Sequence, residues 1–330
     1  MRAIVAQGTG GPEVLALGEI ERPEPGPDEV RIRVAASAVN RADVAQRQGN
    51  YPAPPGESEI LGLEVAGRID ALGDGVSRWK VGDRVMTLVG GGGYADYAVA
   101  PASTLLAVPE RFDLVRAAAI PEVFVTAYLN IFREAALRQN EVLLVHGGAS
   151  GVGTAAIQLA RRLRDARVLV TVGSDAKAEA CRALGAETIL YHSESFADRV
   201  RALTDKRGAD VILDHIGGGY LAENLRCLAG YGRLVVIGLL GGAKAELNLG
   251  QLMVKRQRII GSVLRARPVA EKAEICRAFR AEVMPLLEDG RLEPVIHARL
   301  PLADAAEAHR LMGANANTGK LVLVVDEGLD

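Results

Sequence analysis

The sequence predicts an α/β protein of two domains, one with a doubly wound parallel sheet and one rich in antiparallel strands. The apolar, branched run Val142–Val145 is typical of a buried strand, and a glycine-dense turn leads from it into a helical pattern at Thr154–Leu163. From Glu141 to about Ser262, short strands and helices alternate, as they do in a doubly wound sheet. The chain before about residue 120 instead shows the irregular alternation that is typical of antiparallel strands.

Each strand of the expected parallel sheet is short and continuously apolar, because such strands are buried on both faces. In chain order the strands are predicted at Val142–Val145, Val168–Val172, Thr188–Tyr191, Val211–Asp214, Leu234–Gly238 and Ile259–Ser262. Helices are predicted between them at Ala176–Leu184, Phe196–Thr204 and Tyr220–Leu228.

Both ends of the chain contribute to the predicted β-rich domain. Val30–Ala35 alternates charged and apolar residues, as a half-exposed strand does. Further short strands are expected at Arg2–Ala6, Glu64–Ala71 and Arg84–Leu88. After Pro268, two helical stretches lead to Leu321–Val325, a strand with no helix behind it. We therefore expect the parallel-sheet domain to be inserted into a β-rich domain that the C-terminal segment completes.

Composition excludes several classes of function. The 330 residues carry a net charge of −2 with acids and bases mixed, so no basic face for nucleic acid is expected. Apolar runs are interrupted within about ten residues, too short to span a bilayer. No apolar core follows Met1–Gln7, so we expect no signal peptide and a cytoplasmic protein. The three cysteines, Cys181, Cys227 and Cys276, are too far apart for a zinc site and are expected to be reduced thiols.

A glycine turn, Gly148–x–x–Gly151–x–Gly153, follows the first strand of the parallel sheet. It brings backbone N–H groups and a helix N-terminus to one point, which suits a phosphate. Ser150, Gly151 and Val152 are the residues expected to contact that phosphate. The spacing differs from the dinucleotide fingerprint G-x-G-x-x-G, so the turn alone is compatible with a nucleotide site or with a purely structural tight turn.

Motifs along nearly the whole chain carry a resemblance to a known family. They are Gly10–Glu13, Ala35–Asp43, Gln46–Pro52, Gly62–Gly67, Val81–Val85, Ala119–Glu122, Gly151–Leu159, Ile216–Gly218, Gly238–Gly242, Ser262–Arg265 and Asn317–Lys320. In these motifs the chain resembles the zinc-free quinone oxidoreductase branch of the medium-chain dehydrogenase/reductase superfamily, and most of all the tumour-suppressor-inducible NADPH quinone oxidoreductases. The resemblance implies a GroES-like catalytic domain at residues 1–122 and 266–330, and a Rossmann NADP-binding domain at residues 123–265.

Zinc-dependent members of this superfamily hold a catalytic metal with a Cys in the loop matching Asn40–Asp43 and a His in the segment matching Gly62–Glu64. Neither segment contains Cys or His here, and no histidine precedes His146. A zinc site needs Cys, His or carboxylate donors in the right place, so we expect no metal. Without a Lewis acid to polarise an alcohol, alcohol dehydrogenation is disfavoured as the main activity.

The choice between NAD and NADP depends on the end of the second strand. There Gly173 allows close approach, Ser174 and Lys177 are candidates to bind the 2′-phosphate of NADP, and Tyr191 lies beside them. In the competing interpretation Asp175 binds the ribose, which would favour NAD. The family resemblance supports NADPH as the cofactor.

The resemblance also implies the residues that hold the nicotinamide half and close over the cofactor. These are Asn40, Thr126, Gly217, Gly238, Leu239, Leu240, Leu264, Arg265, Asn317 and Lys320.

The expected reaction is hydride transfer from NADPH to a quinone or an α,β-unsaturated carbonyl, whose oxygen needs only a hydrogen-bond donor. The candidate donors are Asn40 and Tyr51. A tyrosine at the position of Tyr51 is the supposed proton donor of related enoyl-thioester reductases, whereas the alternative is a loop tyrosine that anchors a proline-rich turn. For Glu64, Glu122 and His146 we expect structural roles.

Two other functions stay open: a 2-enoyl-thioester reductase, and an NADPH-bound crystallin-like or RNA-binding protein. The near-neutral charge counts against nucleic acid, so the expected partners are a small-molecule quinone or enone, with no nucleic acid and no membrane. Relatives assemble through the edges of their cofactor-domain sheets, and the apolar strand Ile259–Ser262 is consistent with such a covered edge. We therefore expect a homodimer or homotetramer.

Overall fold

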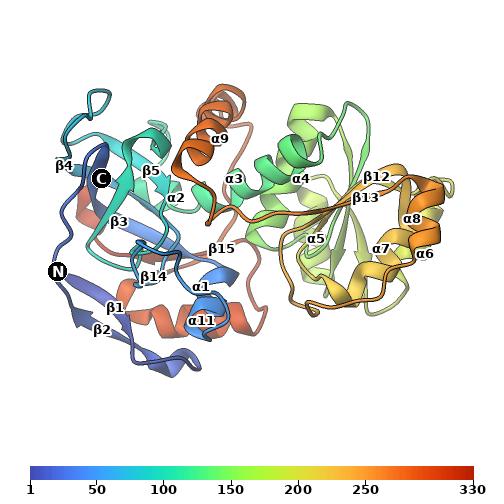
Figure 1. The fold of residues 1–330 in the computed structure, drawn as a ribbon, viewed down its shortest axis with the longest axis horizontal. Coiled ribbons are helices and arrows are strands. Elements are labelled where there is room, and N and C mark those ends of the chain that lie inside the picture. Colours follow the sequence, from blue (N-terminus) through green and yellow to red (C-terminus); the bar gives the residue numbers. More distant parts are fainter. The chain divides into compact units, whose positions relative to one another are not determined.

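The computed structural model describes residues 1–330, and the chain divides into two compact units (Figure 1). The β-rich unit comprises Met1–Val125 and Leu264–Asp330, and the parallel-sheet unit comprises Thr126–Val263. These limits fall a few residues from the expected boundaries at residues 122/123 and 265/266.

The parallel-sheet unit contains a six-stranded sheet in the order β10-β9-β8-β11-β12-β13, in which all neighbours are parallel. Its strands are β8 (Val142–Val145), β9 (Arg167–Val172), β10 (Glu187–Leu190), β11 (Ala209–Asp214), β12 (Leu228–Val236) and β13 (Arg258–Gly261). The helices of this unit are α4 (Gly151–Arg164), α5 (Asp175–Ala183), α6 (Phe196–Leu203), α7 (Leu221–Cys227) and α8 (Leu249–Lys255). The strand order reverses direction between β8 and β11, and ligands of doubly wound sheets bind at that point, outside the carboxyl ends of the strands.

Apolar side chains on both faces of this sheet form the core of the unit, as the continuous apolar runs predicted. Leu144, Leu169 and Ile212 are completely buried. One strand differs from the prediction: β12 begins at Leu228, inside the segment expected to be helical. Its first half contains Gly230 and Gly232, which interrupt the apolar pattern that identifies a strand.

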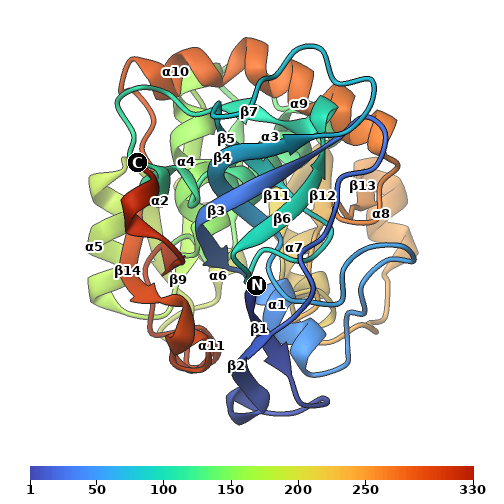
Figure 2. The same cartoon turned by 90° about the vertical axis from the view of Figure 1, so that its left-hand side faces the viewer.

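The β-rich unit contains a seven-stranded sheet in the order β14-β15-β3-β4-β5-β7, with β6 also paired to β3. Its strands are β3 (Glu29–Val39), β4 (Glu64–Leu72), β5 (Arg84–Leu88), β6 (Tyr97–Pro101), β7 (Leu106–Ala107), β14 (Ile296–Pro301) and β15 (Lys320–Val324), and β1 (Arg2–Ala6) and β2 (Leu15–Glu19) form a separate hairpin. All pairs are antiparallel except β14 with β15. The C-terminal strands, in red, lie beside the blue strand β3 (Figure 2).

Strand register in the β-rich unit brings three distant segments together. The last strand β15 pairs with β3 so that Leu321 lies opposite Val39, which puts the preceding Lys320 next to Asn40. On its other side β3 pairs with β4, with Ser37 opposite Val65, so β4 begins near the same point with Glu64. The sheet therefore assembles a polar cluster from residues that are remote in sequence.

Six helices accompany this sheet: α1 (Arg41–Arg47), α2 (Leu114–Ala117), α3 (Pro121–Tyr128), α9 (Val269–Glu282), α10 (Met284–Glu288) and α11 (Ala305–Gly313). The helical stretch Leu114–Glu134 is long and apolar enough to cross a membrane, contrary to the expectation that every apolar run is too short. Its most apolar window is 83% buried inside the protein, however, as in the core helix of a soluble protein.

Candidate functional site

The turn after β8 has a shape that only glycine permits. A Cβ on Gly148 would lie 2.4 Å from the Cβ of Val170, and one on Gly153 would lie 2.4 Å from the carbonyl oxygen of Gly148. The turn therefore packs directly against β9 and against the first turn of α4. Ser150 caps this helix by accepting a hydrogen bond from the Gly153 N–H at 3.0 Å.

The first N–H groups of α4, on Gly151 and Val152, have no acceptor within the helix. Both residues are only partly buried, so these donors face outward at the positive end of a fourteen-residue helix. An anionic phosphate oxygen is the natural acceptor for such a pair of donors.

A buried hydrogen-bond chain supports the turn from below. The Gly147 N–H donates to Thr171 Oγ1 at 3.2 Å, and that hydroxyl lies 3.1 Å from Nδ1 of His146. Nε2 of His146 lies 2.6 Å from Asn224 Oδ1, and Asn224 Nδ2 donates to Asp214 Oδ2 at 3.1 Å. Because the Asn224 amide donates to a carboxylate, its oxygen must accept from His146. Burial lowers the pKa of His146 to about 3, so the ring is neutral and acts as a hydrogen-bonded link.

This series of hydrogen bonds ends at Asp214, in the turn after β11. Asp214 accepts hydrogen bonds from the N–H groups of Ile216 at 2.7 Å and Gly217 at 3.2 Å. Gly217 has φ 81°, and a Cβ there would lie 2.8 Å from the Gly242 carbonyl oxygen. The loop after β12 is thus packed onto the loop after β11. Gly238 of the former loop lies against His215 of the latter, and the next two residues, Leu239 and Leu240, are exposed. Thr126, also in the parallel-sheet unit, has a buried hydroxyl with no hydrogen-bond partner.

The end of β9 gathers the residues expected to bind the 2′-phosphate. A Cβ on Gly173 would lie 2.8 Å from the Tyr191 hydroxyl, so the tyrosine lies directly over the glycine. Ser174 caps α5 by accepting from the Lys177 N–H at 3.4 Å. Asp175 is the first residue of α5 and is exposed, where its charge favours the helix N-terminus.

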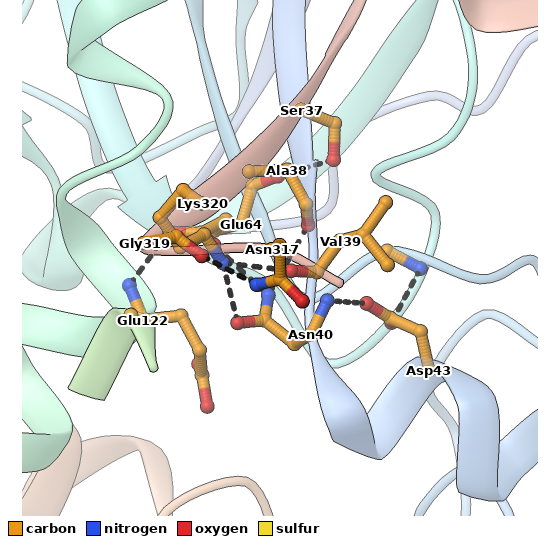
Figure 3. Close-up of polar contacts among 12 residues, drawn as sticks. Ser37, Ala38, Val39, Asn40, Asp43, Glu64, Glu122, Asn317, Gly319 and Lys320 are labelled. Atoms are coloured by element: carbon orange, nitrogen blue, oxygen red, sulfur yellow. Dashed lines mark hydrogen bonds and ion pairs between the residues drawn. The ribbon is translucent and has the colours of Figure 1, made fainter. Parts of the chain in front are cut away.

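In the β-rich unit, Lys320 is buried at the centre of the polar cluster (Figure 3). Its Nζ lies 2.7 Å from Glu64 Oε1 and donates to Asn40 Oδ1 at 2.6 Å and to the Val39 carbonyl at 2.9 Å. Asn40 Nδ2 in turn donates to Glu64 Oε1 at 2.9 Å and to the Ala38 carbonyl at 3.2 Å. All three N–H groups of Lys320 and both of the Asn40 amide therefore bond to oxygens of this chain.

Asp43 fixes the loop that carries Asn40. The carboxylate accepts from the N–H groups of Asn40 at 2.7 Å and Gly62 at 3.1 Å, and from the Tyr94 hydroxyl at 3.1 Å. Burial raises the pKa of Asp43 to about 6, although these hydrogen bonds and Lys320 oppose the shift. Asp43 thus joins α1 to the segment before β4.

A second chain of contacts continues from Tyr94 to the C-terminal helix. The Tyr94 hydroxyl lies 3.2 Å from Nε2 of His309 on α11, and His309 Nδ1 lies 3.3 Å from Arg47 Nη1. Burial, together with Arg47, lowers the pKa of His309 to about 3, so this ring is also neutral. Arg47 is buried and bonded to the Gly10 carbonyl at 3.0 Å, which gives it a structural role.

Glu122 stands at the start of α3, bound to the cluster through its backbone. Its N–H donates to Glu64 Oε2 at 2.8 Å, while its side chain is directed away from Glu64 and makes no hydrogen bond within the chain (Figure 3). Burial and the neighbouring charge of Glu64 raise the pKa of Glu122 to about 8. At neutral pH this carboxyl is therefore mostly protonated. Sequence reasoning expected only a structural contact here, because the pattern does not reveal a second carboxylate nearby.

Tyr51 and Arg265 are stacked in the same unit. The guanidinium carbon of Arg265 lies 5.3 Å from the centre of the Tyr51 ring, and Arg265 Nε donates to the Gly90 carbonyl at 2.7 Å. Nη1 and Nη2 of Arg265 are buried without a hydrogen-bond partner. The Tyr51 hydroxyl has no partner within the chain, and burial and the charge of Glu122 raise its pKa.

The remaining expected contacts are Leu264 and Asn317, and both are buried. Asn317 Nδ2 donates to the Gly319 carbonyl at 2.7 Å, which closes the turn before β15. No group of three or more His, Cys, Asp or Glu side chains is arranged to hold a metal ion.

Comparisons with known proteins extend over the same residues. Residues 151–279 match the family described as zinc-binding dehydrogenase, and residues 26–110 match the alcohol dehydrogenase GroES-like domain. The chain is 35% identical over 329 residues to a quinone oxidoreductase of Homo sapiens, covering 98% of each chain. It is 38% identical over 321 residues to a quinone oxidoreductase of Pseudomonas aeruginosa, covering 96% of this chain and 97% of the relative. The structure of Escherichia coli quinone oxidoreductase complexed with NADPH matches with a TM-score of 0.89 and 29% identity, over 98% of this chain and 100% of that one.

Proposed function

The chain belongs to the quinone oxidoreductases of the medium-chain dehydrogenase/reductase superfamily, and from this premise we propose that it uses NADPH to reduce quinones or related electron-poor enones without zinc. The observation that carries the proposal is the pair of outward N–H donors on Gly151 and Val152, located where the strand order reverses.

The residues of the parallel-sheet unit fit NADPH. The pyrophosphate would be bound at the N-terminus of α4, next to Ser150. At the end of β9 the Tyr191 hydroxyl lies over Gly173, and Ser174 and Lys177 stand at the start of α5, which supports a 2′-phosphate; Asp175, the competing ribose ligand, is the first residue of the same helix. The unpartnered Thr126 hydroxyl is a further polar group available to the cofactor. The loops at Gly217 and at Gly238, Leu239 and Leu240 are the proposed nicotinamide contacts of this unit.

The cofactor supplies a hydride, and the protein residues supply orientation and a proton. Tyr51 is the proposed donor to the acceptor's oxygen, since its hydroxyl is unpaired within the chain. Asn40 is the other candidate donor and an expected cofactor contact, but both of its amide protons are already donated to Glu64 and Ala38. For Asn40 and Lys320 we propose that they position the surrounding loops. Leu264, Arg265 and Asn317 are the remaining proposed cofactor contacts of the β-rich unit.

The experiment that tests this function follows NADPH oxidation by absorbance, with EDTA present and with NADH in parallel. The acceptors are an ortho-quinone, a simple enone and a crotonyl thioester. Quinone turnover that prefers NADPH and resists chelation is the expected result. A strong preference for the thioester would instead make the chain an enoyl-thioester reductase, and tight NADPH binding without turnover would make it a binding protein.

We further propose that the enzyme is a cytoplasmic homodimer joined through the β13 edge. Leu249, Met253 and Val254 on α8 are 66%, 72% and 77% exposed, and Ile259 on the edge strand is 39% exposed. Exposed apolar side chains beside an unpaired strand edge are typical of a covered interface. Met253→Glu should convert the dimer to a monomer in light scattering after size exclusion. A wild-type monomer would refute the proposed interface, and a tetramer would require a second one.

A further inference from the structure

A buried link of four polar side chains joins two loops of the parallel-sheet unit. Its members are Thr171 on β9, His146 directly after β8, Asn224 on α7 and Asp214 at the end of β11. Each of these side chains is at most 1% exposed. Polar groups buried so completely are costly unless they are hydrogen-bonded. The link satisfies them with one another and with the backbone of the two loops.

The direction of each hydrogen bond in the link follows from its chemistry. Burial raises the pKa of Asp214 to about 6, so this group is mostly ionised at neutral pH and accepts from Asn224 Nδ2 at 3.1 Å. The amide oxygen of Asn224 therefore accepts from His146 Nε2 at 2.6 Å. Since the ring is neutral, its Nδ1 accepts from the Thr171 hydroxyl at 3.1 Å, and that hydroxyl accepts from the Gly147 N–H at 3.2 Å. Turning any of these side chains breaks hydrogen bonds to two partners.

At its other end the link holds the turn after β11. Asp214 Oδ1 accepts from the Ile216 N–H at 2.7 Å, and Oδ2 accepts from the Gly217 N–H at 3.2 Å. The His146 ring also packs edge-on against Tyr220, in the short helical turn that follows Gly217, with ring centres 4.8 Å apart. His146 is thus adjacent in sequence to the glycine turn after β8 and adjacent in space to the turn after β11.

The two turns also meet directly. A Cβ on Gly147 would lie 2.4 Å from Nε2 of His215, so a side chain of the turn after β11 lies against the turn after β8. β8 and β11 are neighbours at the place where the strand order reverses. The turns after them flank the point where a doubly wound sheet binds its ligand. The buried link therefore fixes the spacing of two surfaces that face the same ligand site.

We propose that Asn224 and His146 are positioning residues, which hold the turn after β8 and the turn after β11 at the spacing that NADPH requires. The inference rests on the proposed function, which assigns the pyrophosphate to the first turn and the nicotinamide to the second. Both side chains are completely buried, so they act through the turns and not by contact with the cofactor. A fixed spacing lets the two halves of NADPH reinforce each other's binding and aligns the nicotinamide for hydride transfer.

Amide hydrogen exchange in the cofactor-free protein tests the link itself. Asn224→Leu keeps nearly the same volume and removes the hydrogen bonds to His146 and Asp214. Its effect is measured at the Gly147 N–H, which bonds to Thr171 and not to Asn224. We expect this amide to exchange at least about fivefold faster than in wild type. If Gly147 exchanges at the wild-type rate, the link transmits nothing and the proposal is wrong.

Thr171→Val tests the link from the opposite end and hardly changes shape, so it serves even if Asn224→Leu does not fold. Here the distant amide is that of Gly217, and we expect its exchange to be at least about fivefold faster. The control is Thr188→Val, the same change on the neighbouring strand β10, where the hydroxyl makes no hydrogen bond within the chain. Exchange at Gly217 that is as slow in Thr171→Val as in this control overturns the proposal.

Cofactor binding separates a positioning role from a purely structural one. Calorimetry compares NADPH with 2′-phospho-ADP-ribose, which is the same molecule without its nicotinamide. A structural defect raises both Kd values equally, whereas loss of positioning weakens mainly the intact cofactor. We expect Asn224→Leu to lower the ratio of the fragment Kd to the NADPH Kd by about tenfold. At saturating NADPH, kcat on an ortho-quinone should fall by about tenfold as well.

The possible failures can be told apart. Equal changes in both Kd values would make Asn224 a structural residue and overturn the inference. If wild type reduces the quinone with NADPH and Asn224→Leu keeps the wild-type Kd ratio and kcat, only this inference fails. If wild type reduces no acceptor with NADPH, the proposed function itself fails.

Discussion

Replacing Lys320 by Met tests whether this residue holds the β-rich unit together or binds the cofactor. The substitution removes the partner of Glu64 and leaves a buried, uncompensated carboxylate, which costs about 3–5 kcal/mol. Asn40 Oδ1 and the Val39 carbonyl also lose their donor, and each unsatisfied acceptor costs about 1–3 kcal/mol where the loop cannot relax. We therefore expect Lys320→Met to lower the free energy of unfolding by at least about 3 kcal/mol without any cofactor.

The chain's single tryptophan makes this measurement specific. Trp79 lies in the β-rich unit, so its fluorescence during urea unfolding follows that unit. Lys80→Met, the same change at an exposed lysine, should alter stability by no more than about 0.5 kcal/mol. Adding Glu64→Gln to Lys320→Met should restore part of the loss, because the unpaired charge is removed. A fully stable Lys320→Met with weakened NADPH binding would refute this reasoning and make Lys320 a cofactor ligand.

Three further predictions concern other parts of the chain. Burial raises the pKa of Glu122 from 4.5 to about 8, so the folded protein holds a proton that the unfolded chain releases between these pH values. The free energy of unfolding of wild type should therefore fall as pH rises from about 4.5 to about 8. The shift corresponds to at most about 5 kcal/mol, and to about 2 kcal/mol once solvent screening is included. Glu122→Gln should abolish this fall in Trp79 urea titrations, and an unchanged pH dependence would contradict the shift. Gly148→Ala drives a Cβ into Val170, so the NADPH Kd measured by calorimetry should rise more than tenfold; an unchanged Kd would show that the turn adapts. Ser174→Asp should repel the 2′-phosphate and lower the ratio of kcat/KM with NADPH to kcat/KM with NADH by at least about tenfold.

Periodicity and turn residues were sufficient to predict the parallel sheet. Its inner strands β8, β9 and β11 are buried on both faces, so the apolar run itself identifies them, and Gly148 and Gly153 stand where a Cβ would collide with a neighbour. The β-rich unit was harder to predict from the same signals. The strand expected at Val30–Ala35 extends to Val39, because its second half is apolar on both faces and loses the alternation.

The polar cluster was beyond the reach of sequence patterns for a different reason. Asn40, Glu64 and Lys320 were each visible as motif residues, but only strand register shows that Lys320 bonds to the other two. The unusual protonation of Glu122 depends on a neighbouring carboxylate and on burial, neither of which is a local property. Which charged side chains meet in the interior depends on the fold, so no repeating pattern in the sequence predicts it.

The pairing of β15 with β3 also sets an order of events during synthesis. Lys320 and Asn40 are 280 residues apart, whereas the parallel-sheet unit is one continuous segment, Thr126–Val263. A ribosome therefore releases all of that segment while Glu64 still lacks its lysine. The parallel-sheet unit can fold first, because all of its residues have been synthesised. The polar cluster around Lys320 forms only after the last strand has emerged. A chain cut before β15 would retain the glycine turn after β8 and lose the cation that pairs with Glu64.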